Sequence, residues 1–429
     1  MLNDLLKRIA DTGRQLTGGA ENRSRDLIEL CESLLRGKGE ATGIATAADI
    51  LDGFRKLNEK DRAVFFKNVV KRFSVDEARL RTAIERFAKE PQATAARELH
   101  FASEPPSQEL VRRLNRAPGG TGALISMRRD LLDAATKHPE LRDLDRDFAH
   151  LLGSWFNRGF LELRRIDWKT PAEVLERIIE YEAVHEITSW DDLRGRVATP
   201  DRRLYGFFHP AIPDEPLIFV EVALTEDIPS SIDSILSSER KPVDPESAKT
   251  AVFYSISNCH AGLRGISFGN FLIKQVVEDL RHELRALRTF VTLSPVPGLR
   301  RWARQQIDAG ESALSEKQKQ LVVALESGNA EPNAPENAKP LAEIAARYLV
   351  QPSERGGAID PVARFHLGNG ARLERIHAGA DPSPRGMKSS WGVMVNYQYA
   401  LGDIERNHET YASTGEVVRS SGVKRLAKA

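Results

Sequence analysis

The feature that most restricts the fold of this chain is a strand–helix–strand pattern between Thr250 and Ser294. Residues 251–257 (Ala-Val-Phe-Tyr-Ser-Ile-Ser) have the composition of a buried strand, and residues 289–294 (Thr-Phe-Val-Thr-Leu-Ser) form a second one. Between them, apolar residues recur at helical spacing from Phe271 to Leu287. This order predicts a βαβ unit, in which the two strands are parallel and the crossover is right-handed.

The loop that enters the helix has the composition of an anion-binding site. Free amides and the positive end of the helix dipole attract an anion, Gly265 and Gly269 allow close backbone approach, and Arg264 adds charge. Ser294 ends the second strand, at the sheet edge where open α/β sheets bind ligands. We therefore predict an anion site here, against the alternative of a loop that only turns the chain. The loop consists of Arg264, Gly265, Ile266, Ser267, Phe268, Gly269 and Asn270.

A second group of polar residues follows Pro361. The pattern predicts a short helix that ends at the Asn369-Gly370 turn, a strand over residues 371–376 and a closing strand over residues 391–399. His366 on the short helix is a candidate catalytic residue, although a lone histidine is more often structural. The other nine histidines show no two-histidine helical motif, so we expect no metal site.

The rest of the chain divides into two regions of different composition. Up to about Arg165 it reads as successive helices: residues 74–77 (Ser-Val-Asp-Glu) are typical of a capping box, and an apolar stripe runs from Leu144 to Trp155. Two close strands, residues 204–208 and 217–224, predict an antiparallel pair. We expect an α+β protein with a helical N-terminal domain over residues 1–165 and a mixed-sheet domain over residues 166–429.

Charge and composition exclude several classes of protein. The chain has 62 Lys and Arg against 61 Asp and Glu, so it lacks the broad positive surface of a nucleic-acid binder. No apolar run approaches the roughly 18 residues of a membrane span. Cys31 and Cys259 are too few for a disulfide scaffold, and we expect no disulfide between subunits in a reducing compartment. Asp4 and Asp11 near the start argue against a targeting segment, so we expect a cytoplasmic protein that binds neither nucleic acid nor membrane.

Five motifs occur in chain order: residues 253–257 (Phe-Tyr-Ser-Ile-Ser), 269–274 (Gly-Asn-Phe-Leu-Ile-Lys), 293–298 (Leu-Ser-Pro-Val-Pro-Gly), 365–371 (Phe-His-Leu-Gly-Asn-Gly-Ala) and 396–399 (Asn-Tyr-Gln-Tyr). An anion loop at a helix start between parallel strands resembles the GNAT acetyltransferase superfamily. The five motifs together, from about Leu151 to Leu401, resemble the malonyl-CoA decarboxylase family more closely. The chain departs from the vertebrate pattern at Ser267, where that pattern has an acidic residue, so an orienting carboxylate is missing or comes from elsewhere.

The resemblance implies a fold, a reaction and a set of site residues. It implies a GNAT-like catalytic domain that converts malonyl-CoA to acetyl-CoA and carbon dioxide without a metal or covalent cofactor, and a helical domain that assembles a homo-oligomer, often a tetramer. By the same resemblance, Ser294 and His366 are catalytic, residues 264–270 bind malonyl-CoA, and Tyr399 lies in the active site. His366, with an ordinary pKa near 6.5, is then suited to hold the substrate and deliver a proton. The division of steps between Ser294 and His366 stays open.

Two other functions remain open at this stage. An acyltransferase on the same fold would move an acyl group from coenzyme A to an amine, which requires an acceptor channel and a general base. A non-enzymatic coenzyme A-binding regulator would keep the loop but would have no use for Ser294 and His366.

Overall fold

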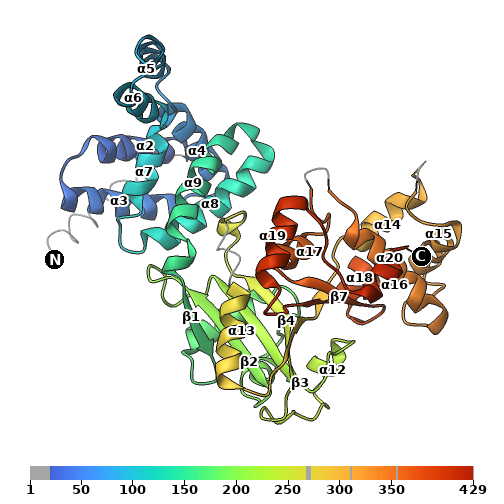
Figure 1. Cartoon of the computed structure of the whole chain (residues 1–429). Coiled ribbons are helices and arrows are strands. Elements are labelled where there is room, and N and C mark those ends of the chain that lie inside the picture. Colours follow the sequence, from blue (N-terminus) through green and yellow to red (C-terminus); the bar gives the residue numbers. More distant parts are fainter. Residues whose placement is uncertain (1–19, 267–271, 310–311, 354–355, 429) are drawn as a thin grey trace. The chain divides into compact units, whose positions relative to one another are not determined.

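The computed structural model describes residues 20–266, 272–309, 312–353 and 356–428 (Figure 1). The chain forms two compact units. The first contains the residues up to Leu161, together with His209–Pro213 and the segment that begins at His260. The second contains Glu162–Phe208, Asp214–Cys259 and the C-terminal part of the chain. A helical region followed by a mixed sheet confirms the predicted α+β class.

Helices make up almost all of the first unit. The apolar stripe predicted on α9 is confirmed, since Leu144, Phe148 and Leu152 are buried. A second core forms around the rings of Phe54 and Phe65, whose centroids lie 5.3 Å apart. The helices are α2 (Ala20–Arg36), α3 (Glu40–Arg55), α4 (Glu59–Phe73), α5 (Glu77–Lys89), α6 (Ala93–Ser103), α7 (Pro106–Leu114), α8 (Gly120–Lys137) and α9 (Arg142–Trp155), with short 3₁₀ turns at Pro139–Leu141 and Arg158–Phe160.

The capping box predicted at Ser74 is wrong. Asp76 caps α5, because its carboxylate accepts the amides of Ala78 and Arg79, both at 3.1 Å, while Ser74 ends α4. Both N-cap types satisfy free amides at a helix start, so the local sequence allowed either residue. The helix itself was correctly predicted, and its N-cap lies two residues later than expected.

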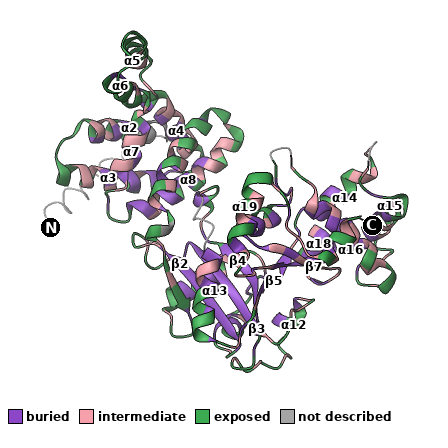
Figure 2. Cartoon of the chain, in the orientation of Figure 1, coloured by how far each residue is buried: buried purple, intermediate pink, exposed green. Residues whose placement is uncertain are grey.

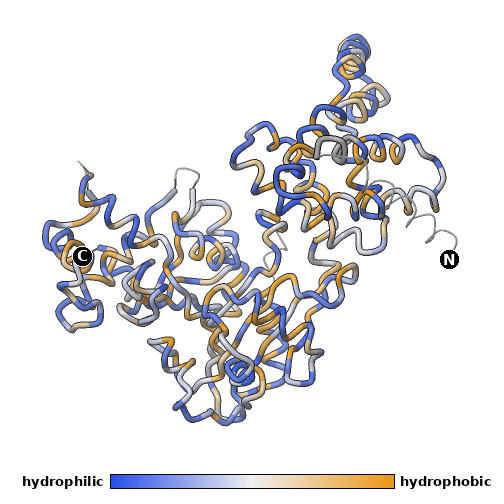
Figure 3. The backbone as a smooth tube through the Cα atoms, turned by 180° about the vertical axis from the view of Figure 1, so that it is seen from behind, coloured by the Kyte–Doolittle hydropathy of each residue, from blue (hydrophilic) through white to orange (hydrophobic). Residues whose placement is uncertain are grey.

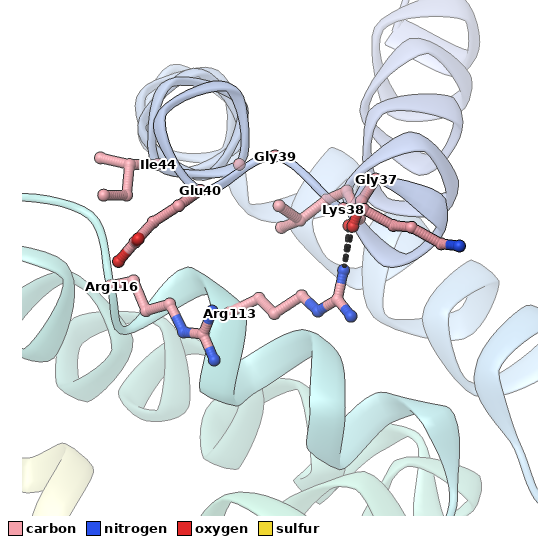
Figure 4. Close-up of a pocket in the computed structure, with 9 residues that line it drawn as sticks. Gly37, Lys38, Gly39, Glu40, Ile44, Arg113 and Arg116 are labelled. Carbon is pink, nitrogen blue, oxygen red and sulfur yellow. Dashed lines mark hydrogen bonds between the residues drawn. The ribbon is translucent and has the colours of Figure 1, made fainter.

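A side chain from α7 completes the end of α2. Arg113 donates from one guanidinium nitrogen to the carbonyl oxygens of Leu34, Leu35 and Gly37, at 2.6, 3.1 and 2.9 Å. Figure 4 shows this side chain reaching the turn between α2 and α3, in a pocket of about 430 Å³ that Arg116 also lines. The last carbonyls of a helix have no partner within the helix, so the guanidinium group of Arg113 supplies hydrogen-bond donors at the C-terminal end of α2.

The second unit is built on one mixed sheet, with neighbours in the order β1-β2-β3-β4-β5-β8-β6 and with β7 paired to β8. Among the strand pairs of the described residues, β4 and β5 are parallel and the others are antiparallel, including the predicted pair β2 and β3. Strands β2, β3, β4, β5 and β8 are largely buried, while α5 and α6 are largely exposed (Figure 2), and apolar residues follow these strands (Figure 3). The strands are β1 (Glu162–Ile166), β2 (Arg202–Phe208), β3 (Ile218–Thr225), β4 (Thr250–Asn258), β5 (Thr289–Thr292), β6 (Ser294–Pro295), β7 (Arg372–His377) and β8 (Met394–Gln398).

The βαβ unit is confirmed, with one correction at Ser294. Helix α13 (Leu272–Glu283) joins β4 to β5, which are parallel in register from Thr250↔Thr289 to Phe253↔Thr292. The second strand ends at Thr292, and Ser294 opens β6, which pairs with β8. The amide of Leu293 makes the last link to β4, and the proline that follows Ser294 has no amide to continue the ladder.

The second unit contains further helices, and one predicted boundary shifts. Trp391 does not belong to the closing strand, because it ends α18 in the left-handed conformation with φ of 52°. No helix in the described ranges is long and apolar enough to cross a membrane. The helices are α10 (Ala172–Tyr181), α11 (Trp190–Val197), α12 (Asp233–Leu236), α14 (Leu299–Ile307), α15 (Glu316–Glu326), α16 (Pro335–Val350), α17 (Pro361–Gly368), α18 (Pro384–Ser390), α19 (Ile404–Thr414) and α20 (Ser421–Lys428).

Candidate active site

The structure brings together three of the residues that the sequence singled out. The Nε2 atom of His366 lies 3.1 Å from the Oγ atom of Ser294, and its Nδ1 atom lies 2.9 Å from the hydroxyl of Tyr399. All three side chains are buried. Both ring nitrogens of the histidine therefore have a hydroxyl partner, one on each side.

Each of these side chains comes from a different part of the second unit. Ser294 begins β6, His366 lies in the last turn of α17, and Tyr399 directly follows β8. The amide of Tyr399 donates to the carbonyl of Phe290 at 2.9 Å, which ties this end of β8 to β5. The site thus forms where strands and a helix from distant parts of the sequence meet.

Burial makes His366 a neutral imidazole. Desolvation lowers its pKa to about 3, because a charged ring is unfavourable without water or an anion beside it. The ring also stacks on Tyr397, with centroids 4.7 Å apart and planes at 24°. The sequence predicts that His366 acts as an acid with an ordinary pKa near 6.5. In the free protein its pKa lies well below that value.

Besides the ring of His366, Ser294 has a second hydrogen-bond partner, the hydroxyl of Thr292, which was not identified from the sequence. Its Oγ atom donates to the Oγ1 atom of Thr292 at 2.9 Å, and that atom also accepts the amide of Tyr397 at 3.1 Å. Asn396 donates to the carbonyl of Thr292 at 2.8 Å. With Ser294 donating to Thr292, the ring proton of His366 lies on Nε2, and Tyr399 donates to Nδ1. The sequence contained one indication of this contact: Thr292 lies two positions before Ser294 in the same predicted strand, and such residues share a face.

The predicted anion loop lies mostly outside the described residues. Ser267, Phe268, Gly269 and Asn270 are outside them.

The beginning of that loop is described and belongs to the first unit. Gly265 has φ of 79°, and the amide of Ile266 donates to the carbonyl of Leu263 at 3.0 Å. Arg128 holds the preceding turn, because it donates to the carbonyl oxygens of Gly262 and Arg264 at 2.8 and 3.0 Å. The anion-binding role of the loop, including that of Arg264, stays a prediction.

A second buried polar cluster, which the sequence did not indicate as a site, lies around Glu182. Its carboxylate accepts the hydroxyls of Ser255 at 2.8 Å and Ser257 at 3.2 Å, and the amides of Val184 and His185 at 2.7 and 2.8 Å. We call these residues the Glu182 cluster. Its acceptor oxygens are occupied by donors from the protein.

The two cysteines form no disulfide with each other. Cys31 and Cys259 are both free and buried, and desolvation raises the pKa of each thiol, that of Cys31 to about 12. Neither thiol is therefore a reactive nucleophile at neutral pH.

Comparison with known proteins gives one consistent result. The family model described as the malonyl-CoA decarboxylase C-terminal domain matches residues 159–429, and the N-terminal domain model matches residues 73–156. Mitochondrial malonyl-CoA decarboxylase of Anser anser anser is 39% identical over 347 residues, which cover 74% of this chain and 69% of that protein. The protein of the same name from Mus musculus is 33% identical over 460 residues, covering 96% and 93%.

Solved structures agree in fold over nearly the whole chain. The crystal structure of malonyl-CoA decarboxylase from Rhodopseudomonas palustris matches with a TM-score of 0.90 at 52% identity and covers 94% of this chain and 99% of that one. The enzyme from Agrobacterium vitis matches with a TM-score of 0.88 at 50% identity, covering 94% and 99%. Family models, curated relatives and solved structures together place this chain in the malonyl-CoA decarboxylase family, a family of carboxy-lyases.

Proposed function

We propose that this chain converts malonyl-CoA to acetyl-CoA and carbon dioxide, with Ser294, His366 and Tyr399 as the catalytic residues. The observation that carries the assignment is the buried histidine whose two ring nitrogens each contact a hydroxyl. Family membership supports the choice of substrate and reaction. The residues around His366 supply the rest of the argument.

The reaction requires stabilisation of the negative charge that develops on the enolate and the delivery of one proton. When the bond between the carboxylate and C2 of the malonyl group breaks, its electron pair enters the thioester carbonyl as an enolate, and carbon dioxide leaves. C2 then takes one proton, so the overall reaction consumes a proton. Because the thioester itself accepts the electron pair, we propose that no metal or covalent cofactor takes part.

The neutral state of His366 suits an anionic substrate. A malonyl carboxylate that enters this buried site places a negative charge beside the ring, which raises the pKa of His366 and favours uptake of a proton. Tyr399 accommodates both states, because its hydroxyl donates to a neutral Nδ1 and accepts from a protonated one. Substrate binding would then load the proton that the product requires.

We propose that Ser294 relays that proton. In the proposed step, the hydroxyl proton of Ser294 moves to C2 while the Nε2 proton of the imidazolium moves to the serine oxygen, a path of 3.1 Å between the two protein atoms. The ring ends neutral with its proton on Nδ1, beside the hydroxyl of Tyr399, the serine is regenerated, and the enolate becomes the acetyl thioester; exchange of the ring proton with solvent restores the Nε2 tautomer. General acid catalysis of this kind typically contributes about 10²- to 10⁴-fold.

Incubation of the purified chain with malonyl-CoA, followed by mass spectrometry, tests the proposal directly. We expect acetyl-CoA and carbon dioxide, at a rate unchanged by prior treatment with a chelator. Transfer of the acyl group to an added amine would identify an acyltransferase instead. Binding of coenzyme A esters without turnover would identify a regulator.

We also propose that the helical domain, residues 1–165, assembles a homotetramer in the cytoplasm and that residues 166–429 form the catalytic domain. Two apolar side chains on the α5–α6 hairpin support a contact surface, because Ile84 is 50% exposed and Phe101 is 53% exposed. Sedimentation of the full chain, with an Ile84→Glu variant beside it, tests the assembly. Cell fractionation tests the location.

A further inference from the structure

We propose that Asp360 is a positioning residue that sets the separation of Ser294 and His366, an inference that rests on the proposed function of that pair. Asp360 is fully buried, and the hydrogen bonds described for its carboxylate go to Tyr348, Val362 and Ala363 and to neither reacting side chain. It instead connects the elements on both sides of the pair. The relevant geometry consists of two connections, one to the helix of His366 and one to the turn after Ser294.

The first connection fixes α17. One carboxylate oxygen of Asp360 accepts the amides of Val362 and Ala363, both at 2.9 Å, so that Asp360 caps the helix that carries His366. A capping side chain sets both the start of a helix and the direction in which the chain enters it. With only eight residues in α17, that start determines where His366 lies near its end.

The second connection reaches the turn that follows Ser294. The other carboxylate oxygen accepts the hydroxyl of Tyr348 on α16 at 3.1 Å, and this hydroxyl lies directly against Gly298. Gly298 ends the Ser-Pro-Val-Pro-Gly turn and precedes α14. One buried carboxylate thus joins α17 to α16, and Tyr348 of α16 contacts the turn after Ser294.

The space around this junction is filled. A Cβ atom at Gly298 would lie 2.0 Å from the Tyr348 hydroxyl, so only glycine fits without a shift of the tyrosine. The ring of Tyr348 packs in turn against Trp302 on α14, with centroids 5.4 Å apart. Misplacement of a catalytic group by about 1 Å can cost 10²-fold in rate, and the 3.1 Å contact between Ser294 and His366 depends on both connections.

An ordinary helix cap accepts the amides of its own helix and makes no bond to another element. The chain contains such a cap at Asp76. Asp76 accepts two amides of α5 in the same pattern, and α5 lies in the first unit, apart from His366. Asp76→Ala is therefore a matched control for the loss of a cap alone. Asp360→Ser is the informative variant, because a serine hydroxyl still caps α17 but cannot also accept the hydroxyl of Tyr348.

The experiment measures kcat, KM and melting temperature of the full-length enzyme for the wild type, Asp360→Ser, Tyr348→Phe and Asp76→Ala. We expect Asp360→Ser to lower kcat about 10- to 100-fold, by the cost of misplacing a catalytic group, with KM within about threefold. Tyr348→Phe removes one hydroxyl only and should lower kcat by a smaller factor. Asp76→Ala should lower the melting temperature and leave kcat unchanged.

A second readout does not require turnover. In a sample labelled with ¹⁵N-histidine, the ring resonances of His366 should shift in Asp360→Ser and not in Asp76→Ala, because only the first variant changes the contact with Ser294.

An active wild type with unchanged kcat and unchanged His366 resonances in both Asp360→Ser and Tyr348→Phe would overturn the positioning role. If the serine variant fails to fold, Tyr348→Phe decides the question by the same two measurements. A wild type that does not decarboxylate malonyl-CoA would overturn the proposed function, while a shift of the His366 resonances in Asp360→Ser would still support the role of Asp360 in placing the ring.

Discussion

The two buried polar clusters of the second unit contain similar residue types and differ in how their hydrogen bonds are used. Around His366, every group is neutral, and the ring contacts the hydroxyls of Ser294 and Tyr399. In the Glu182 cluster a carboxylate is enclosed by four donors, two from serine side chains and two from the backbone. Serine beside a titratable group is therefore not by itself a sign of catalysis.

The two clusters differ in whether they can still bind a substrate or take up a proton. A buried carboxylate whose oxygens are occupied by protein donors is stable and has no capacity left for a substrate. A neutral imidazole held between two hydroxyls can take up a proton when an anion arrives, at little cost to the free protein. We infer that the Glu182 cluster holds β4 to the loop after α10 and that the His366 cluster performs the chemistry.

The largest expected effect is on turnover at the His366 cluster. His366→Asn and Ser294→Ala should each lower kcat by about 10³-fold, in the range typical of general acid catalysis, with affinity for acetyl-CoA retained. The double variant should be little worse than the poorer single variant, because groups that act together are strongly non-additive. Steady-state kinetics and calorimetry provide the two measurements.

Ser255→Ala in the Glu182 cluster is the matched control for Ser294→Ala. It also removes a buried serine hydroxyl from a hydrogen bond, and we expect kcat within about threefold of the wild type, because Ser255 shares no hydrogen-bond partner with the His366 cluster in the described part of the chain. Two single variants of the His366 cluster with wild-type turnover would contradict the assignment of that cluster.

Glu182→Ala should have the largest effect on stability. It leaves two buried amides and two serine hydroxyls without their acceptor, which we expect to cost about 3 kcal/mol in the free energy of unfolding. Urea unfolding followed by fluorescence measures this loss. If the purified variant instead loses kcat and stays as stable as the wild type, the division between a structural and a catalytic cluster is wrong.

Tyr399→Phe should have an intermediate effect on turnover. The ring still packs, but Nδ1 of His366 loses its only hydroxyl partner among the described contacts. We expect kcat to fall about 10-fold, which corresponds to the roughly 1.4 kcal/mol of one hydrogen bond, while the fold is retained. A fall as large as that of His366→Asn would mean that Tyr399 itself transfers the proton.

The pH dependence of stability should also reflect the buried state of His366. The pKa of His366 lies at about 3 in the folded chain and near 6.5 when unfolded, so the unfolded state binds the extra proton. The stabilisation present above pH 6.5 is therefore lost as the pH falls toward 3, by about 2 kcal/mol between pH 7 and pH 5. Urea unfolding at these two pH values should show a smaller difference in His366→Asn, and an equal difference would mean that His366 is charged in the folded protein.

Much of this molecule could be predicted from local patterns in the sequence. The βαβ unit, the stripe on α9 and the short helix with its Asn369-Gly370 end all rest on periodicity or turn chemistry within a few residues. The errors were also local: Asp76 rather than Ser74 caps α5, and Trp391 ends a helix instead of starting a strand. At each of these positions two conformations satisfy the local rules, and only packing chooses between them.

The sequence by itself placed Ser294 at the end of a predicted strand and His366 on a short predicted helix, and the family resemblance of its motifs added Tyr399. Only the tertiary structure decided that they meet, because Ser294 and His366 lie 72 residues apart in the chain, on β6 and on α17. The neutral state of His366 and the junction at Asp360 were beyond the sequence for the same reason. Both follow from burial by residues that are distant in the chain, and burial is a property of the folded protein.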